Sequence, residues 1–195
     1  MTERVAAIVL AGGRSARFGR DKLAESIRGR PMLDHVIERV RGVTSDIVVV
    51  GRVDRSTART VDTRVVADDR PFEGPLAGLG AGLRALDPAI ERVLVVGGDM
   101  PTLVPAVLAR LIAALGVHEV AVLADDIGPR PLPMAVRRSV AAPAVDRLFA
   151  DGERRLRALL GELDVAVIPP HAWRRDDPDG LTLLDVDVPG DLPRG

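Results

Sequence analysis

Cysteine, tyrosine, asparagine and glutamine are all absent from the 195 residues. Without cysteine the chain forms no disulfide, no thiolate metal site and no thiol nucleophile. Aromatic residues make up 2% of the chain, and 27 Lys and Arg are balanced by 28 Asp and Glu. Neither base-stacking side chains nor a basic excess therefore favours nucleic acid as a partner.

Long apolar runs are missing as well. No stretch approaches the roughly 18 residues that a membrane span needs. The apolar residues 5–10 run straight into glycines, without the basic segment that opens a secretion signal. We therefore expect a cytoplasmic protein with no membrane partner. The 47% hydrophobic content is enough for a folded core, and the length predicts one domain over residues 1–195.

Apolar runs and apolar residues at helical spacing alternate along the first two thirds of the chain. Continuous apolar runs are typical of buried parallel strands, and a helical spacing predicts amphipathic helices. The alternation predicts an α/β fold with three layers, in which a mostly parallel open sheet includes a Rossmann-like nucleotide-binding half. The expected strands are 5–10, 47–50, 64–67, 93–96 and 120–123, and the expected helices are 31–41, 74–86 and 104–115.

The pattern is looser after residue 124. Prolines and glycines mark turns and loops there, and the remaining apolar segments are short. We expect a rigid loop at 128–133, an antiparallel strand at 134–136, helices at 140–148 and 154–163, strands at 165–168 and 181–186, and a surface loop at 169–180.

The loop after the first strand has the composition of a phosphate-binding site. Gly12 and Gly13 allow backbone amides to approach a phosphate, and Arg17 and Lys22 follow at distances that let both reach back over it. The spacing fits neither a P-loop nor a dinucleotide fingerprint. A plain glycine turn with solvated cations is the alternative. Lys22 is nevertheless conspicuous, because it is the single lysine among the 27 basic residues.

A family resemblance appears at these residues. The segment LAGGRSARFGRDK at 10–22 resembles the signature loop of nucleotidyltransferases that use an NTP to cap a phosphorylated acceptor. The resemblance continues at residues 29–33 and at the GDMP segment, 98–101, which is similar to that family's metal site. GPLAG at 74–78 and GERR at 152–155 are most similar to the MobA-like branch, the molybdenum cofactor guanylyltransferases.

The resemblance implies a fold of the nucleotide-diphospho-sugar transferase type and a reaction. GMP would pass from GTP to the phosphate of molybdenum-bound molybdopterin, with release of pyrophosphate and with Mg²⁺ as cofactor. Residues 1–124 would bind the nucleotide and residues 125–195 the acceptor, and molybdoenzymes or cofactor-insertion proteins are further candidate partners. The implied nucleotide-binding residues are Leu10, Ala11, Gly12, Gly13, Lys22, Gly51, Asp68, Gly74, Leu76, Ala77 and Gly78.

Asp99 is the candidate metal ligand. Its carboxylate follows a buried strand and precedes Pro101, and Mg²⁺ prefers one or two carboxylates together with phosphate oxygens and waters. We interpret Arg17, Lys22 and Asp99 as the catalytic residues, with the metal on the reacting phosphate and the two cations on the leaving pyrophosphate. The alternative is that Asp99 caps a helix that begins near Pro101.

Two further aspartates bear on the nucleotide base and the metal. Asp68 is placed to accept hydrogen bonds from guanine, or else forms a turn. Asp185 and Asp187 stand where guanylyltransferases of this branch commonly have asparagines, and on a strand both would face one side. Asp187 would then complete a second metal position opposite Asp99, as in the related molybdopterin cytidylyltransferases. The alternatives are a helix cap and a simple replacement of asparagine by aspartate in a chain that has no asparagine. Three functions stay open beside guanylyl transfer: a molybdopterin cytidylyltransferase, a transferase for another phosphate acceptor, and a GTP-binding partner protein without chemistry.

Two smaller groups of polar residues remain. Glu153, Arg154 and Arg155 follow a glycine, and they either face the phosphate of the acceptor or begin a solvated helix. The three histidines show no spacing typical of metal ligands. His35 lies in the first expected helix and is interpreted as a surface or packing residue.

Overall fold

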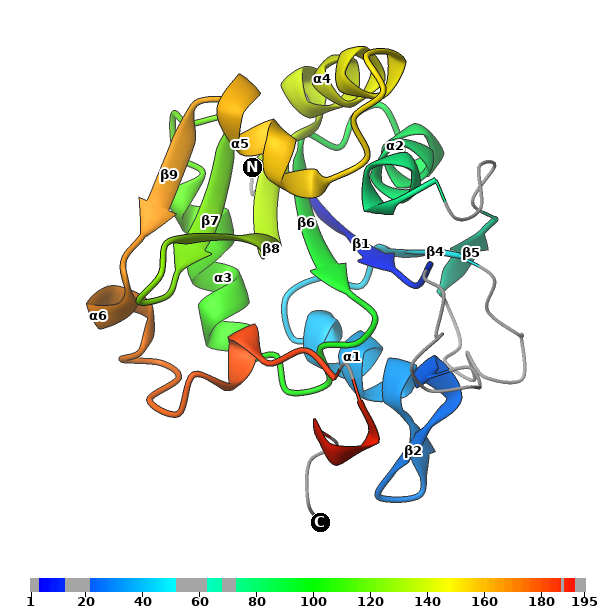
Figure 1. The fold of residues 1–195 in the computed structure, drawn as a ribbon, viewed down its shortest axis with the longest axis vertical. Helices are drawn as coiled ribbons and strands as arrows, with labels where there is room; N and C mark the ends of the chain where they lie inside the picture. Colours follow the sequence, from blue (N-terminus) through cyan, green and yellow to red (C-terminus); the bar gives the residue numbers. More distant parts are fainter. Residues whose placement is uncertain (1–3, 13–21, 52–62, 68–72, 187, 192–195) are drawn as a thin grey trace.

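A seven-stranded sheet forms the centre of the protein, for which the computed structural model describes residues 4–12, 22–51, 63–67, 73–186 and 188–191 (Figure 1). The strand order is β5-β4-β1-β6-β8-β7-β9. Within the described sheet β8 alone is antiparallel to its neighbours. The predicted α/β fold with a mostly parallel sheet is confirmed. The strands are β1 (Val5–Leu10), β4 (Ile47–Val50), β5 (Arg64–Val66), β6 (Arg92–Gly97), β7 (Val120–Ala124), β8 (Pro129–Arg137) and β9 (Val165–Ile168).

Helices cover both faces of this sheet and create two hydrophobic cores. On one face α1 (Met32–Arg41) and α3 (Pro105–Ala114) pack against Ala7 and Val9 of β1. On the other face α2 (Pro75–Ala85) and α4 (Arg138–Ala150) pack against Ala6 and Ile8. Successive residues of β1 thus enter opposite cores, as the two-residue period of a strand requires. All four of these side chains have no exposed surface.

Short elements complete the described chain. A β2–β3 hairpin follows the helical turn η1, and α5 packs its buried Leu159 into the core beside α4. No helix of the described residues is long and apolar enough to span a membrane. The bounds are η1 (Lys22–Ala24), β2 (Ser26–Ile27), β3 (Arg30–Pro31), η2 (Leu156–Ala158), α5 (Leu159–Glu162), α6 (Pro170–Trp173), η3 (Leu181–Leu183) and η4 (Pro189–Asp191).

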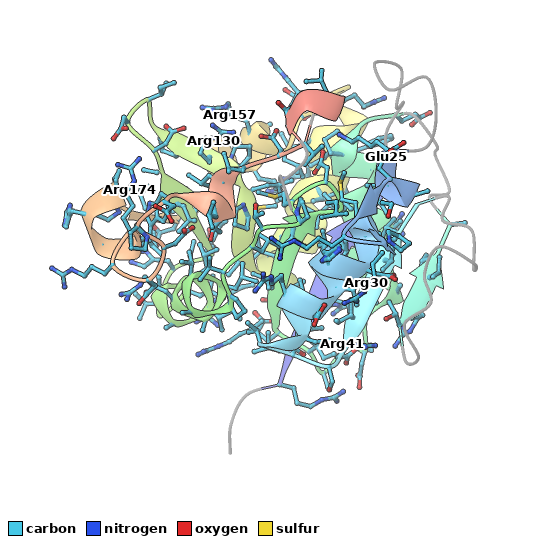
Figure 2. The ribbon with its side chains drawn as sticks, turned by 90° about the horizontal axis from the view of Figure 1, so that it is seen from below. Glu25, Arg30, Arg41, Arg130, Arg157 and Arg174 are labelled. Carbon is cyan, nitrogen blue, oxygen red and sulfur yellow. The ribbon has the colours of Figure 1, made fainter. Side chains whose placement is uncertain are left out.

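The carboxyl ends of β1, β4 and β6 lie at one edge of the sheet, called the carboxyl edge below. Because β8 runs the opposite way, its first residues lie at this edge too. In Figure 1 the arrow of β6 points downward, and Figure 2 shows the molecule from below, which is the side of the carboxyl edge. Ligands of open α/β sheets bind at such an edge.

Three segments after residue 124 differ from the sequence prediction. The expected loop at 128–133 is mostly strand, because β8 begins at Pro129 and pairs there with Ala124. The expected helix at 154–163 is shorter, since η2 begins only at Leu156. The expected loop at 169–180 contains α6, whose Trp173 is 1% exposed and donates its indole N–H to the Ala124 carbonyl at 2.9 Å.

The strand predicted at 181–186 is wrong, and the cause is a buried aspartate. The carboxylate of Asp177, which is 2% exposed, accepts the backbone N–H groups of Leu181 and Thr182 at 3.0 and 2.7 Å. These bonds bend the chain into η3 instead of extending it. Val186 then donates its N–H to the carbonyl of Asp99 at 2.9 Å. No strand therefore forms over residues 181–186, and because Asp187 lies outside the described residues, its placement relative to Asp185 stays a prediction.

Candidate active site at the carboxyl edge

The backbone after β1 is held closely on both sides at the carboxyl edge. The Ala11 N–H donates to the Val50 carbonyl at 2.8 Å, and the Gly98 N–H donates to the Leu10 carbonyl at 2.9 Å. A Cβ on Gly51 would lie 2.5 Å from the Ala11 carbonyl oxygen. Because the amide of Ala11 is already used in the sheet, amides that face a phosphate begin at Gly12, which is exposed.

Lys22 and Asp99 meet at this edge, as the sequence predicts for two parts of one site. The Lys22 ammonium lies 2.8 Å from Oδ2 of Asp99 and donates a second hydrogen bond to the Val186 carbonyl at 3.1 Å. The two side chains are 18% and 28% exposed. Three segments that are remote in sequence, residues 22, 99 and 186, are thus tied together by one ammonium group. Partial burial strengthens this ion pair relative to one in open water.

The surroundings of Asp99 fit a metal cation whose ligands are one protein carboxylate and the phosphate oxygens of a substrate. Its carboxylate already faces a positive group, the Lys22 ammonium. The described residues contain no group of three or more Asp, Glu, His or Cys side chains that would enclose a metal. One carboxylate completed by phosphate oxygens and waters is an arrangement that Mg²⁺ accepts.

The alternative role of Asp99 as a helix cap is wrong. The next helix, α3, begins at Pro105, and its N-cap residue is Val104, without a side-chain cap bond. Asp99 therefore lies six residues before the helix, in the turn after β6. Its side chain is committed to Lys22 instead.

The GPLAG segment takes part through its backbone and its packing. Leu76 has no exposed surface, and its N–H donates to the Arg154 carbonyl at 3.3 Å. Gly74 has a φ of 94°, and a Cβ there would lie 2.8 Å from the same carbonyl oxygen. Gly78 lies beneath Leu10, since its Cβ would be 3.5 Å from Cδ2 of that residue. The backbone and the buried side chains of this segment therefore pack against the residues that form the carboxyl edge. Ala77 is buried as well, with 6% of its surface exposed.

Part of the predicted site lies outside the described residues. Gly13, Arg17, Asp68 and Asp187 are all in this group, and their proposed roles stay predictions. Of the remaining predicted residues, the structure brings one set to the carboxyl edge around the turn after β1. That set is Leu10, Ala11, Gly51, Gly78, Lys22 and Asp99.

Sequence reasoning missed two contributions, and both are backbone carbonyl groups. The Val186 carbonyl holds the Lys22 ammonium, and the Arg154 carbonyl meets the amide at the start of α2. A carbonyl group leaves no mark on residue type, so no side-chain pattern could have identified either one. The D-x-D-x-P pattern around Val186 did predict that this stretch lies near the site. The prediction, however, assigned the role to the two aspartates and not to the carbonyl group of Val186.

Glu153 organises the loop between α4 and η2. Its Oε1 accepts the backbone N–H groups of Arg154 and Arg155 at 2.8 and 2.9 Å, and its Oε2 lies 3.0 Å from Nη2 of Arg155. The hydrogen bond from the Arg155 side chain, followed by those two amides, lowers the pKa of Glu153 to about 2. Arg154 instead lies over the ring of Phe149, at 4.0 Å from its centroid. The group therefore orders an extended loop and begins no helix.

Comparison with known proteins places this geometry in a family. A probable molybdenum cofactor guanylyltransferase of Chloroflexus aggregans is 34% identical over 191 residues, which cover 95% of this chain and 90% of that protein. The crystal structure of molybdopterin-guanine dinucleotide biosynthesis protein A from Archaeoglobus fulgidus has a TM-score of 0.78 and 25% identity, and covers 96% of this chain and 94% of its own. A 4-diphosphocytidyl-2C-methyl-D-erythritol synthase from Anaerococcus prevotii shares the fold at 17% identity, with a TM-score of 0.73 over 97% of this chain and 93% of its own. Because the MobA-like NTP transferase domain also matches residues 7–167, this chain belongs to the MobA-like NTP transferases.

Proposed function

We propose that this chain is a guanylyltransferase that moves GMP from GTP to the phosphate of molybdenum-bound molybdopterin and releases pyrophosphate. One observation carries the proposal: Lys22 and Asp99 are paired at 2.8 Å beside the turn that follows β1. The names of the relatives, which include molybdenum cofactor guanylyltransferases from several bacteria, supply the nucleotide and the acceptor class. Molybdoenzymes and cofactor-insertion proteins stay predicted partners.

The residues at the carboxyl edge align charges and need no general base. The phosphate of the acceptor is already an anionic nucleophile, so no proton has to be removed before it attacks the α-phosphate of GTP. Catalysis then rests on holding the two substrates in line and on neutralising the charge that moves onto the pyrophosphate. Lys22 supplies one positive charge for that leaving group, and Arg17 is the proposed second. The close backbone after β1 fixes where the phosphates lie.

Asp99 is the proposed holder of Mg²⁺, together with phosphate oxygens of the nucleotide. When bound, the metal would polarise the α-phosphate and help to orient the attack. The ammonium of Lys22 keeps the carboxylate turned toward the edge before substrates arrive. Lys22 also has a second acceptor in the Val186 carbonyl, so it can release the carboxylate without leaving the site.

Cytidylyl transfer is the second candidate, and its support is the Asp185 and Asp187 pair. The paired aspartates at 185 and 187 were interpreted as a second metal position on a common strand face. Residues 181–186 form η3 followed by a segment without regular structure, in which Asp185 is exposed. Asp187 lies outside the described residues, so the second metal position stays a prediction. The names of the relatives support guanylyl transfer, which is the activity to test first.

Calorimetric titration with GTP and CTP, each with and without Mg²⁺, tests the nucleotide part of the proposal. We expect binding of GTP to be at least tenfold tighter than that of CTP and to weaken when Mg²⁺ is withheld. Pyrophosphate release with GTP and a molybdopterin acceptor then tests the transfer. Tighter binding of CTP would make this a cytidylyltransferase, and GTP binding without pyrophosphate release would make it a nucleotide-binding partner protein.

A further inference from the structure

One residue anchors the C-terminal segment beside the candidate site, and that residue is Val186. Its side chain is 3% exposed, whereas Asp185 before it and Val188 after it are exposed. Val186 packs with Ile27 of β2 and Met32 of α1 in a small hydrophobic cluster of its own, apart from the two cores of the sheet. Figure 1 shows the C-terminal segment, in orange to red, beside α1. Burial of one aliphatic side chain between exposed neighbours holds the main chain at that point.

The main chain of Val186 is bonded to both charged residues of the site. Its N–H donates to the Asp99 carbonyl at 2.9 Å, and its own carbonyl accepts a hydrogen bond from the Lys22 ammonium at 3.1 Å. The same ammonium lies 2.8 Å from Oδ2 of Asp99. The three residues therefore close a ring of contacts, in which a carboxylate and a peptide carbonyl both hold the ammonium.

The segment that carries Lys22 also builds the pocket for Val186. The Glu25 N–H donates to the Lys22 carbonyl at 3.1 Å, and the Met32 N–H donates to the Glu25 carbonyl at 2.8 Å. These bonds fold the segment into one unit, from which Ile27 and Met32 contact Val186. The backbone of Lys22 and its ammonium are thus both tied to Val186, the backbone through the hydrophobic cluster and the ammonium through the carbonyl group.

A lysine at a reacting centre needs such support because its side chain is long and flexible. The ammonium is a compact charge on a four-carbon stem, and ordering that stem costs conformational entropy. A metal ion on Asp99 would compete with the ammonium for the carboxylate. Because an ammonium has three N–H donors, it can keep the Val186 carbonyl as an acceptor and donate to a phosphate oxygen with another N–H.

We propose that Val186 is a positioning residue that acts through Lys22. Its side chain, packed against Ile27 and Met32, holds its carbonyl where the ammonium needs an acceptor. The carbonyl then keeps the positive charge at the carboxyl edge when a nucleotide is bound. The proposal rests on the proposed function for the role of Lys22 in nucleotide binding and transfer, and it adds the residue that places the Lys22 ammonium.

Lys22 is the single lysine of the chain, so the position of this ammonium can be followed directly by NMR. Protein that is isotope-labelled in lysine alone gives side-chain signals from Lys22 only. In the wild type we expect the two Hε protons to have distinct chemical shifts and the Cε group to have the order parameter of a rigid side chain. In Val186→Ala the two Hε shifts should merge and the order parameter should fall. Val186→Ile keeps a branched apolar side chain and should keep the signals of the wild type.

Val145→Ala is the matched control for these spectra. Val145 is 2% exposed, and it lies on α4 in the core of the sheet and not in the cluster of Val186. The control removes the same atoms from a buried valine and should leave the Lys22 signals as in the wild type. Unchanged signals in Val186→Ala, or an equal change in the control, would overturn the proposal. The spectra are recorded without nucleotide, so their outcome does not depend on whether the chain transfers GMP.

A double-mutant cycle tests whether Val186 acts on nucleotide binding through Lys22. The dissociation constant for GTP with Mg²⁺ is measured by calorimetry for Val186→Ala, Lys22→Ala and the double variant. Because a hydrogen bond to a charged group is worth about tenfold in affinity, we expect Val186→Ala to weaken binding about 5-fold to 10-fold. With Lys22 already replaced, Val186→Ala should change the dissociation constant by less than about twofold.

The cycle also separates the positioning role from the proposed reaction. An equal loss of affinity in both backgrounds would overturn the proposal, because Val186 would then act on the nucleotide without Lys22. If the losses are non-additive as expected but the wild type transfers no GMP, guanylyl transfer fails and the positioning role of Val186 stands.

Discussion

The two sides of the carboxyl edge are built from different parts of the chain. On the nucleotide side, between β4 and β6, the main chain itself makes the close contacts, and Gly51 and Gly98 leave room for it. Around β8 and η2, by contrast, long arginine side chains are held by a carboxylate and a carbonyl group. Contacts made by the main chain fix the position of neighbouring groups because no side chain can rotate away, whereas arginine side chains can change conformation.

The largest loss of activity is expected at Lys22 and Asp99, the two charged residues of the proposed nucleotide side. Lys22→Ala removes the proposed partner of the leaving pyrophosphate, and Asp99→Ala removes the proposed metal ligand. Loss of one preorganised charge contact at a reacting centre costs about 100-fold or more in rate. We therefore expect the rate of pyrophosphate release to fall by at least about 100-fold in each variant, while far-ultraviolet circular dichroism shows a folded chain.

A matched ion pair away from the edge provides the control for this test. Nη2 of Arg110 lies 2.5 Å from Oδ2 of Asp176, and its side chain is 39% exposed. Arg110→Ala should lower stability slightly and leave the rate within about twofold, because surface ion pairs contribute about 0–1 kcal/mol. A Lys22→Ala or Asp99→Ala enzyme with a near-normal rate would remove that residue from the mechanism.

Helix α2 packs against both β1 and α4. Two of its glycines therefore allow the tightness of packing on β1 and on α4 to be compared within one helix. A Cβ on Gly82 would lie 2.8 Å from Cδ1 and Cγ2 of Ile8, the buried residue of β1 beneath the nucleotide side. A Cβ on Gly80 would lie 3.1 Å from Cγ1 of Val145 on α4. Alanine gains about 1 kcal/mol over glycine inside a helix, and overpacking costs about 1–3 kcal/mol.

These opposing amounts predict different outcomes for the same substitution at the two positions. In urea unfolding, Gly82→Ala should lower the free energy of unfolding by about 1–2 kcal/mol, since Ile8 is enclosed on all sides. Gly80→Ala should leave it within about 0.5 kcal/mol, because the gain in helix propensity offsets a milder contact. Equal stability of the two variants would mean that β1 is no more tightly packed than α4.

The nucleotide side was predictable from the sequence because its requirements restrict residue type. Close backbone approach needs glycine, a buried strand needs an apolar run, and a charge at the end of a strand is conspicuous. The turn after β1, Lys22 and Asp99 were all identified in this way. The parallel core of the fold was predicted to within a residue or two for β1, β4 and β6.

The part of the chain after residue 124 was predicted less well, because its form depends on tertiary contacts. The buried carboxylate of Asp177 converts an expected strand into η3, although its sequence is as apolar as that of a strand. Pairing with Ala124 draws Pro129 into β8, against the usual preference of proline-rich segments for loops. Arg157 lies 28 positions after Pro129, and only the tertiary fold brings its guanidinium to the Pro129 carbonyl.

The smallest effect concerns the loop between α4 and η2, and it depends on pH. Glu153 has a folded-state pKa of about 2, below its ordinary value of 4.5. A depressed carboxyl pKa stabilises the fold fully above pH 4.5, and that contribution is lost as the pH falls toward 2. The free energy of unfolding of Glu153→Gln should therefore lie below that of the wild type at pH 7, and the difference should shrink between pH 4.5 and pH 2. Because the carboxylate is open to solvent, added salt should reduce the difference as well. The control Glu162→Gln, whose carboxylate lies 3.9 Å from Arg147, should change little at any pH. A difference that stays constant down to pH 2 would mean that the loop is held by packing and not by the charge of Glu153.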